Sequence, residues 1–237
     1  MAKKKKVKDK EMNENSDKTG DKQKLKNQNK QLIVLIVIML GVIILTLGIY
    51  FYTQNFVNKF SYINLDFQKT KSGQTMFYSA RIPIADQYNN IIGNFPINLR
   101  NDPRELEKID TNIINGNVTF YKANTVYVSA DSNIEKCEDG TMALATMSIF
   151  LKDFANLRLK AATFDTDYSR EQNAIFVNCS TNPQNTVIII KEGDKTSVMK
   201  TAENCYELTY NKCEIMPASE KFIVTILDGY MGYFEKE

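Results

Sequence analysis

The stretch that decides the fold runs from residue 125 to residue 164 and reads TVYVSADSNIEKCEDGTMALATMSIFLKDFANLRLKAATF. Its opening TVYVSAD, residues 125–131, predicts a strand. Asp139 suits the start of a helix that runs to about Ala155, and residues 157–164 predict a second strand. A strand, a helix and a strand of this length predict a parallel strand pair joined by a right-handed crossover.

The predicted helix has Met142, Ala145, Ile149 and Phe150 among its apolar positions. The elements expected after residue 164 are a short helix near 168–172, a hairpin of strands 186–191 and 196–201 around Glu192-Gly193-Asp194, and a last helix from about Ser219 to Phe234. Glu220 and Lys221 open that helix and are interpreted as capping and surface charge.

The region before residue 125 is predicted to be rich in strands. Residues 77–85 and 91–99 flank the turn-rich DQYNN and predict a β-hairpin. Asp102-Pro103-Arg104-Glu105 combines an N-cap, an N1 proline and an N3 glutamate, so a short helix is expected there. Residues 118–121 predict a further short strand.

This order of elements resembles a thioredoxin-like domain over about residues 118–234. The family places a redox CxxC at the start of the helix after its central strand. Cys137 stands in that place here, with Gly140 at the position of the second cysteine. The family also has a cis-proline directly before the strand that matches TVIIIK, whereas Pro183 is nearby but not adjacent. The resemblance implies an α/β fold with a thioredoxin-like core in a mixed-sheet domain and a β-rich N-terminal extension.

Residues 32–52, LIVLIVIMLGVIILTLGIYFY, contain no charge. A helix of this run would be about 31 Å long, close to the ~30 Å hydrocarbon core of a bilayer. Tyr50, Phe51 and Tyr52 cluster at one end, as an interfacial aromatic belt does. The alternative, a cleavable signal peptide, needs a shorter apolar stretch and small residues at a cleavage site, and TQNFVNKF follows instead. We therefore predict a single transmembrane helix at residues 31–53.

The first 30 residues form a basic tail with eleven Lys and five acidic residues, whereas the remaining 207 have nineteen basic and twenty-three acidic ones. Such a polar stretch is predicted to be disordered. The chain is predicted to be a single-pass protein of the cell membrane. Lysines directly before the span place its N-terminus in the cytoplasm and its C-terminal domain outside. The tail is interpreted as a topology determinant. The alternatives are attraction to anionic lipid headgroups and nucleic-acid binding, which the absence of aromatic residues disfavours.

The predicted organisation is a cytoplasmic tail at 1–30, a transmembrane helix at 31–53, a β-rich membrane-proximal region at 54–116 and an α/β domain with disulfides at 117–237. The lipid bilayer is the first expected partner, an extracytoplasmic protein the second, and no nucleic acid is expected.

The chain has four cysteines, Cys137, Cys179, Cys205 and Cys213. An even number outside the cytoplasm predicts disulfides, with three possible connectivities. Cys205 and Cys213 bracket CYELTYNKC, an expected hairpin, which favours a local bridge and leaves Cys137 with Cys179. The thioredoxin-like resemblance supports the same pairing, because there the helix start packs beside the loop that holds Pro183.

Cys137 is also a candidate catalytic residue, with Cys179 as its resolving partner. A helix N-terminus can lower the pKa of a thiol, whereas Glu135, Glu138 and Asp139 would raise it. We expect structural bridges. The alternatives are a redox-active Cys137–Cys179 pair and free or metal-bound thiols, of which zinc is disfavoured because the chain has no CxxC knuckle.

Two N-x-S/T sequons follow the span. Asn117 is the predicted glycosylation acceptor, at a strand edge, whereas Asn178 precedes a cysteine that we expect to be bridged.

Asp131, Asp165 and Asp167 follow predicted parallel strands, whose carboxyl ends are where ligands bind in open α/β sheets. Their oxygens are candidate ligands for Mg²⁺ or Ca²⁺. The alternative, which we expect, is that they are turn residues and that Asp139 is an N-cap, with no metal and no cofactor. The run DTDYS also departs from the phosphatase pattern.

The chain contains no His, which excludes Ser-His-Asp and Cys-His nucleophiles and HExxH metal sites. The leading hypothesis is a single-pass membrane protein with a non-catalytic extracytoplasmic binding or assembly domain stapled by disulfides. The competing hypothesis is a membrane-tethered thiol–disulfide oxidoreductase that uses Cys137 with Cys179.

Overall fold

The computed structural model describes residues 30–53, 58–86, 88, 90–121 and 125–234. The basic tail predicted at residues 1–30 lies outside these residues except for Lys30. The apolar helix expected at 31–53 is present as Lys30–Tyr52, and its length and composition are sufficient to cross a membrane. Residues 58–237 form a separate compact unit.

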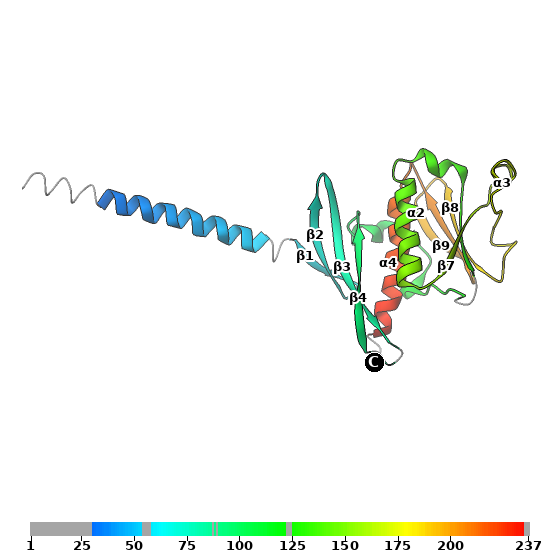
Figure 1. Cartoon of the computed structure of the whole chain (residues 1–237), viewed down its shortest axis with the longest axis horizontal. Helices are drawn as coiled ribbons and strands as arrows, with labels where there is room; N and C mark the ends of the chain where they lie inside the picture. Colours follow the sequence, from blue (N-terminus) through cyan, green and yellow to red (C-terminus); the bar gives the residue numbers. More distant parts are fainter. Residues whose placement is uncertain (1–29, 54–57, 87, 89, 122–124, 235–237) are drawn as a thin grey trace, which may run out of the picture. The chain divides into compact units, whose positions relative to one another are not determined.

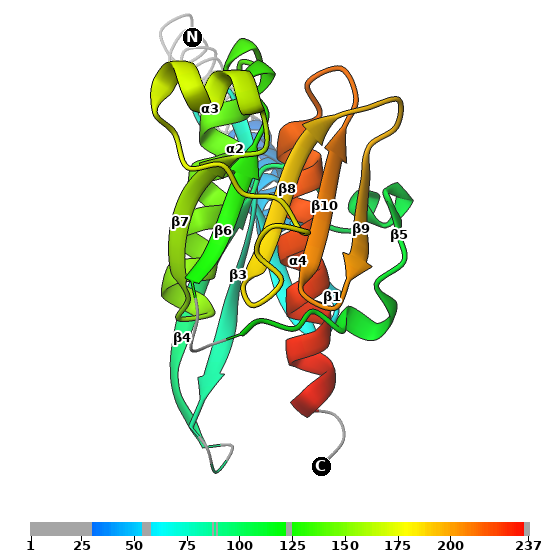
Figure 2. The same cartoon turned by 90° about the vertical axis from the view of Figure 1, so that its right-hand side faces the viewer.

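Two sheets frame this second unit (Figure 1). The first is an antiparallel meander of β1 (Lys59–Tyr62), β2 (Leu65–Ser72), β3 (Thr75–Ala85) and β4 (Ile91–Leu99). The second is mixed, in the order β5 (Asp110–Thr111), β9 (Ser197–Ala202), β10 (Cys205–Tyr210), β8 (Thr186–Glu192), β6 (Thr125–Ala130) and β7 (Arg158–Thr163) (Figure 2). The predicted mixed α/β class is therefore present, and the hairpin predicted at 77–85 and 91–99 is confirmed as β3–β4.

The parallel unit predicted from residues 125–164 is also confirmed. β6 and β7 pair in parallel, with Val126 opposite Leu159. They are connected through α2 (Gly140–Ile149), which continues into a wider helical turn, Phe150–Phe154.

Of the apolar positions named above, Phe150 is buried in the core, whereas the others are exposed on α2. Met142 is 51% exposed and Ile149 is 56% exposed, whereas Ala143 and Met147 are fully buried. Every one of these residues is apolar or small, so the sequence pattern does not select one face of this helix.

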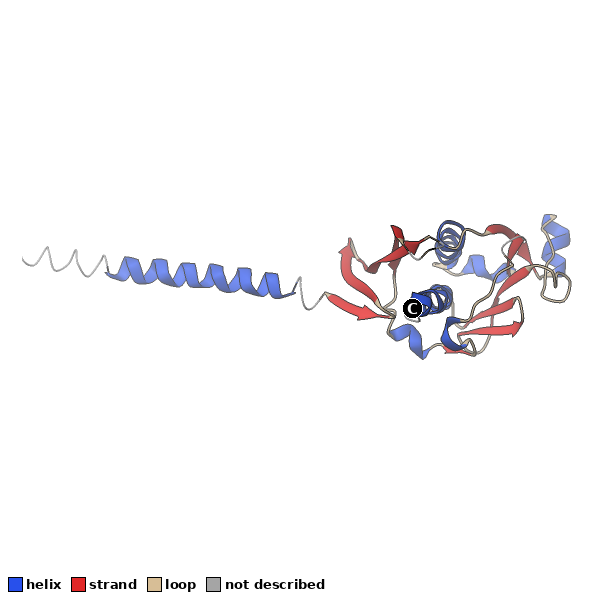
Figure 3. Cartoon of the chain, turned by 90° about the horizontal axis from the view of Figure 1, so that it is seen from below, coloured by secondary structure: helices blue, strands red, loops and turns tan. Residues whose placement is uncertain are grey.

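The last helix, α4 (Ile215–Phe234), lies between the two sheets, as the end-on view in Figure 3 shows. From Ile215 to Leu227 every residue except Pro217 is buried. The interpretation of Glu220 and Lys221 as surface charge is therefore wrong, because the first sheet covers the side of α4 that would otherwise face solvent. Glu220 is 0% exposed and Lys221 is 8% exposed.

The position of β10 overturns two predicted hairpins. β10 lies between β8 and β9, parallel to β8 and antiparallel to β9. Strands 186–191 and 196–201 are therefore not neighbours, and residues 205–210 are one extended strand that forms a hairpin with β9 instead of turning back on itself toward Cys213. Tyr206, Leu208 and Tyr210 are buried, which is why β10 occupies the centre of the sheet.

Of three short elements that were predicted, one is present as expected. The helix near 168–172 is present as α3 (Thr166–Gln172). The helix expected after Asp102 is only a 3₁₀ turn, Glu105–Lys108. Residues 118–121 form no strand.

Candidate functional site

The disulfide pairing differs from the predicted one. Cys137 is bonded to Cys213, with Cα atoms 5.3 Å apart, and Cys179 to Cys205, with Cα atoms 5.7 Å apart. A bridge between Cys205 and Cys213 is excluded because β10 begins at Cys205, and its six residues alone span about 17 Å. A disulfide requires Cα atoms within roughly 7 Å.

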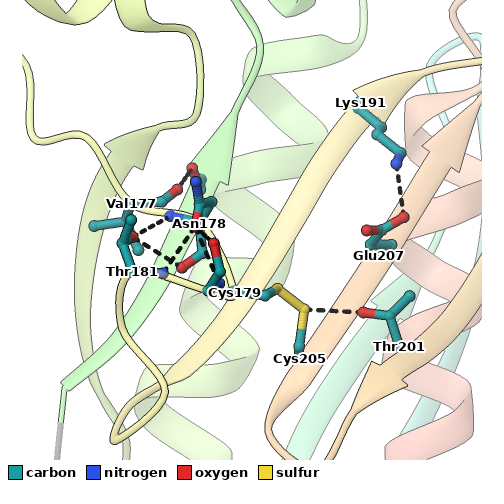
Figure 4. Close-up of a disulfide and its surroundings, with 10 residues drawn as sticks. Val177, Asn178, Cys179, Thr181, Lys191, Thr201, Cys205 and Glu207 are labelled. Atoms are coloured by element: carbon teal, nitrogen blue, oxygen red, sulfur yellow. Dashed lines mark hydrogen bonds and ion pairs between the residues drawn. A yellow bond between two sulfur atoms is a disulfide. The ribbon is translucent and has the colours of Figure 1, made fainter.

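All four cysteines are bonded, and Cys137 and Cys179 belong to different bridges. The candidate pair of a nucleophilic Cys137 and a resolving Cys179 is therefore contradicted. Cys205 is buried in the sheet, and Thr201 donates a hydrogen bond to its Sγ at 3.0 Å (Figure 4).

The two sequons differ in their surroundings. The Asn178 side chain holds a tight turn, where its Oδ1 accepts from the N–H groups of Ser180 at 3.0 Å and Thr181 at 2.9 Å (Figure 4). Asn117 is exposed. Asn117 thus remains the predicted acceptor.

Asp131, directly after β6, lies where the strand order reverses between β6 and β8, the usual ligand position in an open α/β sheet. Its carboxylate accepts from the N–H of Asn133 at 3.0 Å, the N–H of Glu192 at 2.9 Å and the hydroxyl of Tyr210 at 3.0 Å. Burial, together with this hydrogen bond, raises the pKa of Tyr210 well above its usual value. Asp131 thus joins the ends of three strands.

Asp165 caps α3. Its carboxylate accepts from the N–H groups of Tyr168 at 3.1 Å and Asp167 at 3.0 Å and from the Ser132 hydroxyl at 3.2 Å. These bonds, that from Tyr168 above all, lower the pKa of Asp165. Asp167 is exposed and only 3.8 Å from Arg170.

The metal candidates therefore share one edge of the sheet without converging on a point. In the described part of the chain, no three side chains of His, Cys, Asp or Glu gather as metal ligands. Asp139 does not cap α2 through its side chain and instead pairs with Arg100 at 2.6 Å. Asp131 and Asp165 are thus assigned structural roles.

Beside these residues an open cleft of about 570 Å³ lies between α2 and β7. Val128 of β6 and Leu159 of β7 form its apolar floor, and Leu144 and Ser148 of α2 form one wall. Residues 173–175, which follow α3, form the opposite wall. The side chains of the floor are only half-buried, so apolar surface of the sheet is left open here.

Apolar surface continues from the cleft around α2. Met142, Ala145 and Ile149 are exposed, and no charged residue occurs between Gly140 and Leu151. Sequence reasoning missed this surface because apolar helix positions are usually taken as core. The available signal was a helix apolar on all sides, which has more apolar surface than one sheet covers.

Comparisons with protein-family models, curated proteins and solved structures give no match for this chain.

Proposed function

We propose that the chain is a single-pass membrane protein whose domain lies outside the cytoplasm and acts as a non-catalytic binding or assembly module. The apolar helix Lys30–Tyr52 and the lysines that precede it support the anchor and its orientation. Two disulfides support an oxidising compartment for the domain. The bilayer is the first partner, and the basic tail adds attraction to anionic headgroups.

The thioredoxin-like architecture of residues 118–234 is part of this proposal at the level of fold only. The parallel unit of β6, α2 and β7 supports it, whereas the place of β10 between β8 and β9 departs from the expected hairpin.

The observation that carries the binding role is the open cleft between α2 and β7. Of the charged residues that line it, Asp131 is committed to three strand ends, whereas Glu135 and Lys160 are exposed. The floor and the α2 wall are mainly apolar, with Val128, Leu144 and Leu159 partly exposed, and exposed apolar surface of this kind marks interaction sites.

The test of the binding role uses the full chain in its native membrane. Ser148→Arg places a charge in the cleft wall, and Gln74→Arg adds the same side chain to the exposed β2–β3 turn as the matched control. After mild solubilisation, the wild type and Gln74→Arg are expected to migrate as a species larger than the free chain. Ser148→Arg is expected to migrate at the mass of the free chain in its lipid–detergent micelle.

A wild-type protein that already migrates at the mass of the free chain would contradict the binding role. So would a Ser148→Arg protein that melts at the wild-type temperature and still migrates with the larger species. Location is tested separately: a protease added to intact cells is expected to digest residues 58–237 and to leave the N-terminal tail protected.

A further inference from the structure

We infer that the free edge of β7 binds an extended polypeptide segment in which apolar and acidic residues alternate. This inference rests on the proposed function, because it names the occupant of the same cleft. The segment would add a strand to the six-stranded sheet, a recognition mode in which main-chain hydrogen bonds give affinity and alternate side chains give specificity.

The edge is open over most of its length. β7 ends the strand order of the sheet, and Figure 2 shows it on the outer side. At its last residue, Thr163, the N–H donates to the carbonyl of Ile175 at 2.8 Å and the carbonyl accepts from the N–H of Val177 at 2.9 Å. Among the described residues, no segment pairs with this edge between Arg158 and Ala162.

The two backbone hydrogen bonds of Thr163 show which backbone groups of β7 point away from β6. Because backbone groups alternate in direction along a strand, the N–H and C=O groups of Leu159 and Ala161 point outward as those of Thr163 do. An incoming segment therefore meets two donors and two acceptors along the edge. The incoming segment must end before Thr163, because Ile175 and Val177 already pair with that residue. Its paired length is therefore about five residues, opposite Arg158 to Ala162.

One face of the added strand would meet apolar surface. Leu159 packs against the main core on the side of α2, and Ala161 shares that face of β7. The side chains of the incoming segment on this side enter the cleft, beside Leu144 and Ser148. Apolar side chains suit these positions because Val128, Leu144 and Ser148, which line the cleft there, are uncharged.

The other face would meet two cations. Arg158 and Lys160 are exposed, and neither side chain forms an ion pair or a hydrogen bond with any described residue. Tyr127 lies opposite Lys160 on β6, so no acidic residue from the neighbouring strand neutralises it. Acidic side chains directly across from these cations are favoured, and basic ones are disfavoured.

The same lysine explains why an arbitrary strand does not add here. An exposed charge on an edge strand opposes pairing with apolar or basic strands, which protects the protein from aggregation. A partner with acidic residues at alternate positions overcomes this protection, so Lys160 selects for the charge of the segment.

The test uses tryptophan fluorescence, because the chain contains no Trp. Ile175→Trp places a reporter at the end of the free edge, where Ile175 is 50% exposed, and Tyr233→Trp, on α4, is the control reporter. Each full-length protein is placed in phosphatidylcholine nanodiscs. The probes are the blocked peptides Val-Glu-Val-Glu-Val-Glu and Val-Lys-Val-Lys-Val-Lys.

The acidic peptide is expected to shift the emission of Ile175→Trp to shorter wavelength in a saturable way and to leave Tyr233→Trp unchanged. The basic peptide is expected to bind at least tenfold more weakly. Adding Arg158→Glu and Lys160→Glu is expected to reverse this preference, which a merely destabilised protein would not do.

Equal binding of both peptides would overturn the charge selection and leave the cleft as a binding surface. Binding of neither peptide would overturn strand addition altogether. In both cases the migration of Ser148→Arg in native membranes decides separately on the proposed function.

Discussion

Glu220, in the second turn of α4, accepts a hydrogen bond from the backbone N–H of Arg100 at 2.6 Å, at the end of β4. The N–H and the side-chain amide of Asn101 donate to the same carboxylate at 2.9 and 2.7 Å. The Arg100 guanidinium turns the other way and pairs with Asp139, at the start of α2. Arg100, which directly follows β4, thus connects the first sheet to both α4 and α2.

Removal of the Glu220 carboxylate is expected to destabilise the domain strongly. Glu220→Ala leaves three donors without an acceptor in a buried site, which costs roughly 3 kcal/mol or more. Urea unfolding of the full chain in detergent measures the change. The control, Glu203→Ala, removes an exposed carboxylate and is expected to change stability by less than about 0.5 kcal/mol. Equal effects of the two substitutions would contradict the role of Glu220.

The same carboxylate predicts a pH dependence. Burial raises the pKa of Glu220 above its ordinary value of 4.5, although the hydrogen bonds from Arg100 and Asn101 oppose the shift. Because the folded state binds this proton more tightly than the unfolded state, the contribution of Glu220 to stability is greatest below the unfolded pKa. It is lost as the pH rises through the folded pKa.

Glu220→Gln removes this titration. The stability of the wild type relative to Glu220→Gln is therefore expected to fall as the pH rises above the ordinary glutamate pKa of 4.5. Urea unfolding of both proteins at several pH values measures it. A stability difference that is independent of pH would show that Glu220 titrates alike in the folded and unfolded states.

The orientation of α2 predicts that substitutions on its buried face cost more stability than substitutions on its exposed face. Met147 is fully buried, so Met147→Ala is expected to cost about 2–5 kcal/mol. Ile149, two residues later, is 56% exposed, so Ile149→Ala is expected to cost less than about 1 kcal/mol. Thermal or urea unfolding of the two variants gives the comparison. A larger loss for Ile149→Ala would mean that α2 turns its other face to the core.

A close backbone contact links α4 to the 3₁₀ turn Ile114–Gly116, which follows β5. A Cβ added to Gly229 would collide with the carbonyl oxygen of Gly116, which itself has a φ of 61°. Gly229→Ala is therefore expected to destabilise the domain by more than about 2 kcal/mol. Three residues later, a Cβ at Gly232 meets no atom within 4 Å, so Gly232→Ala is expected to be neutral or to stabilise α4 by about 0.5 kcal/mol. If both variants melt alike, the two backbones are not in contact.

The sequence was sufficient for features that depend on local pattern. The unit of β6, α2 and β7 follows from its turn residues and apolar runs, and the β3–β4 hairpin from DQYNN between two apolar strands. The charge-free run before residue 53 predicted the long helix in the same way. The pairings that were predicted correctly, β3 with β4 and β6 with β7, join strands that follow one another in the chain.

The errors concern partners that are distant in the chain. Nothing in CYELTYNKC shows that its first six residues insert between β8 and β9, because the pairing depends on the burial of the whole sheet. The wrong disulfide pairing followed from that one misplaced strand. The burial of Glu220 likewise depends on β4, 120 residues earlier. The cleft was missed for a related reason, since no local pattern shows which face of α2 lacks a cover.

The central claim is a disulfide-stapled domain outside the cytoplasm, in which β10 occupies the middle of the sheet. The most direct measurement is a non-reducing peptide map of the full chain, purified from membranes whose free thiols were blocked at lysis. The expected result is peptides that join Cys137 to Cys213 and Cys179 to Cys205, with no blocked cysteine. A Cys205–Cys213 peptide would contradict the position of β10, and four blocked cysteines would contradict the location outside the cytoplasm.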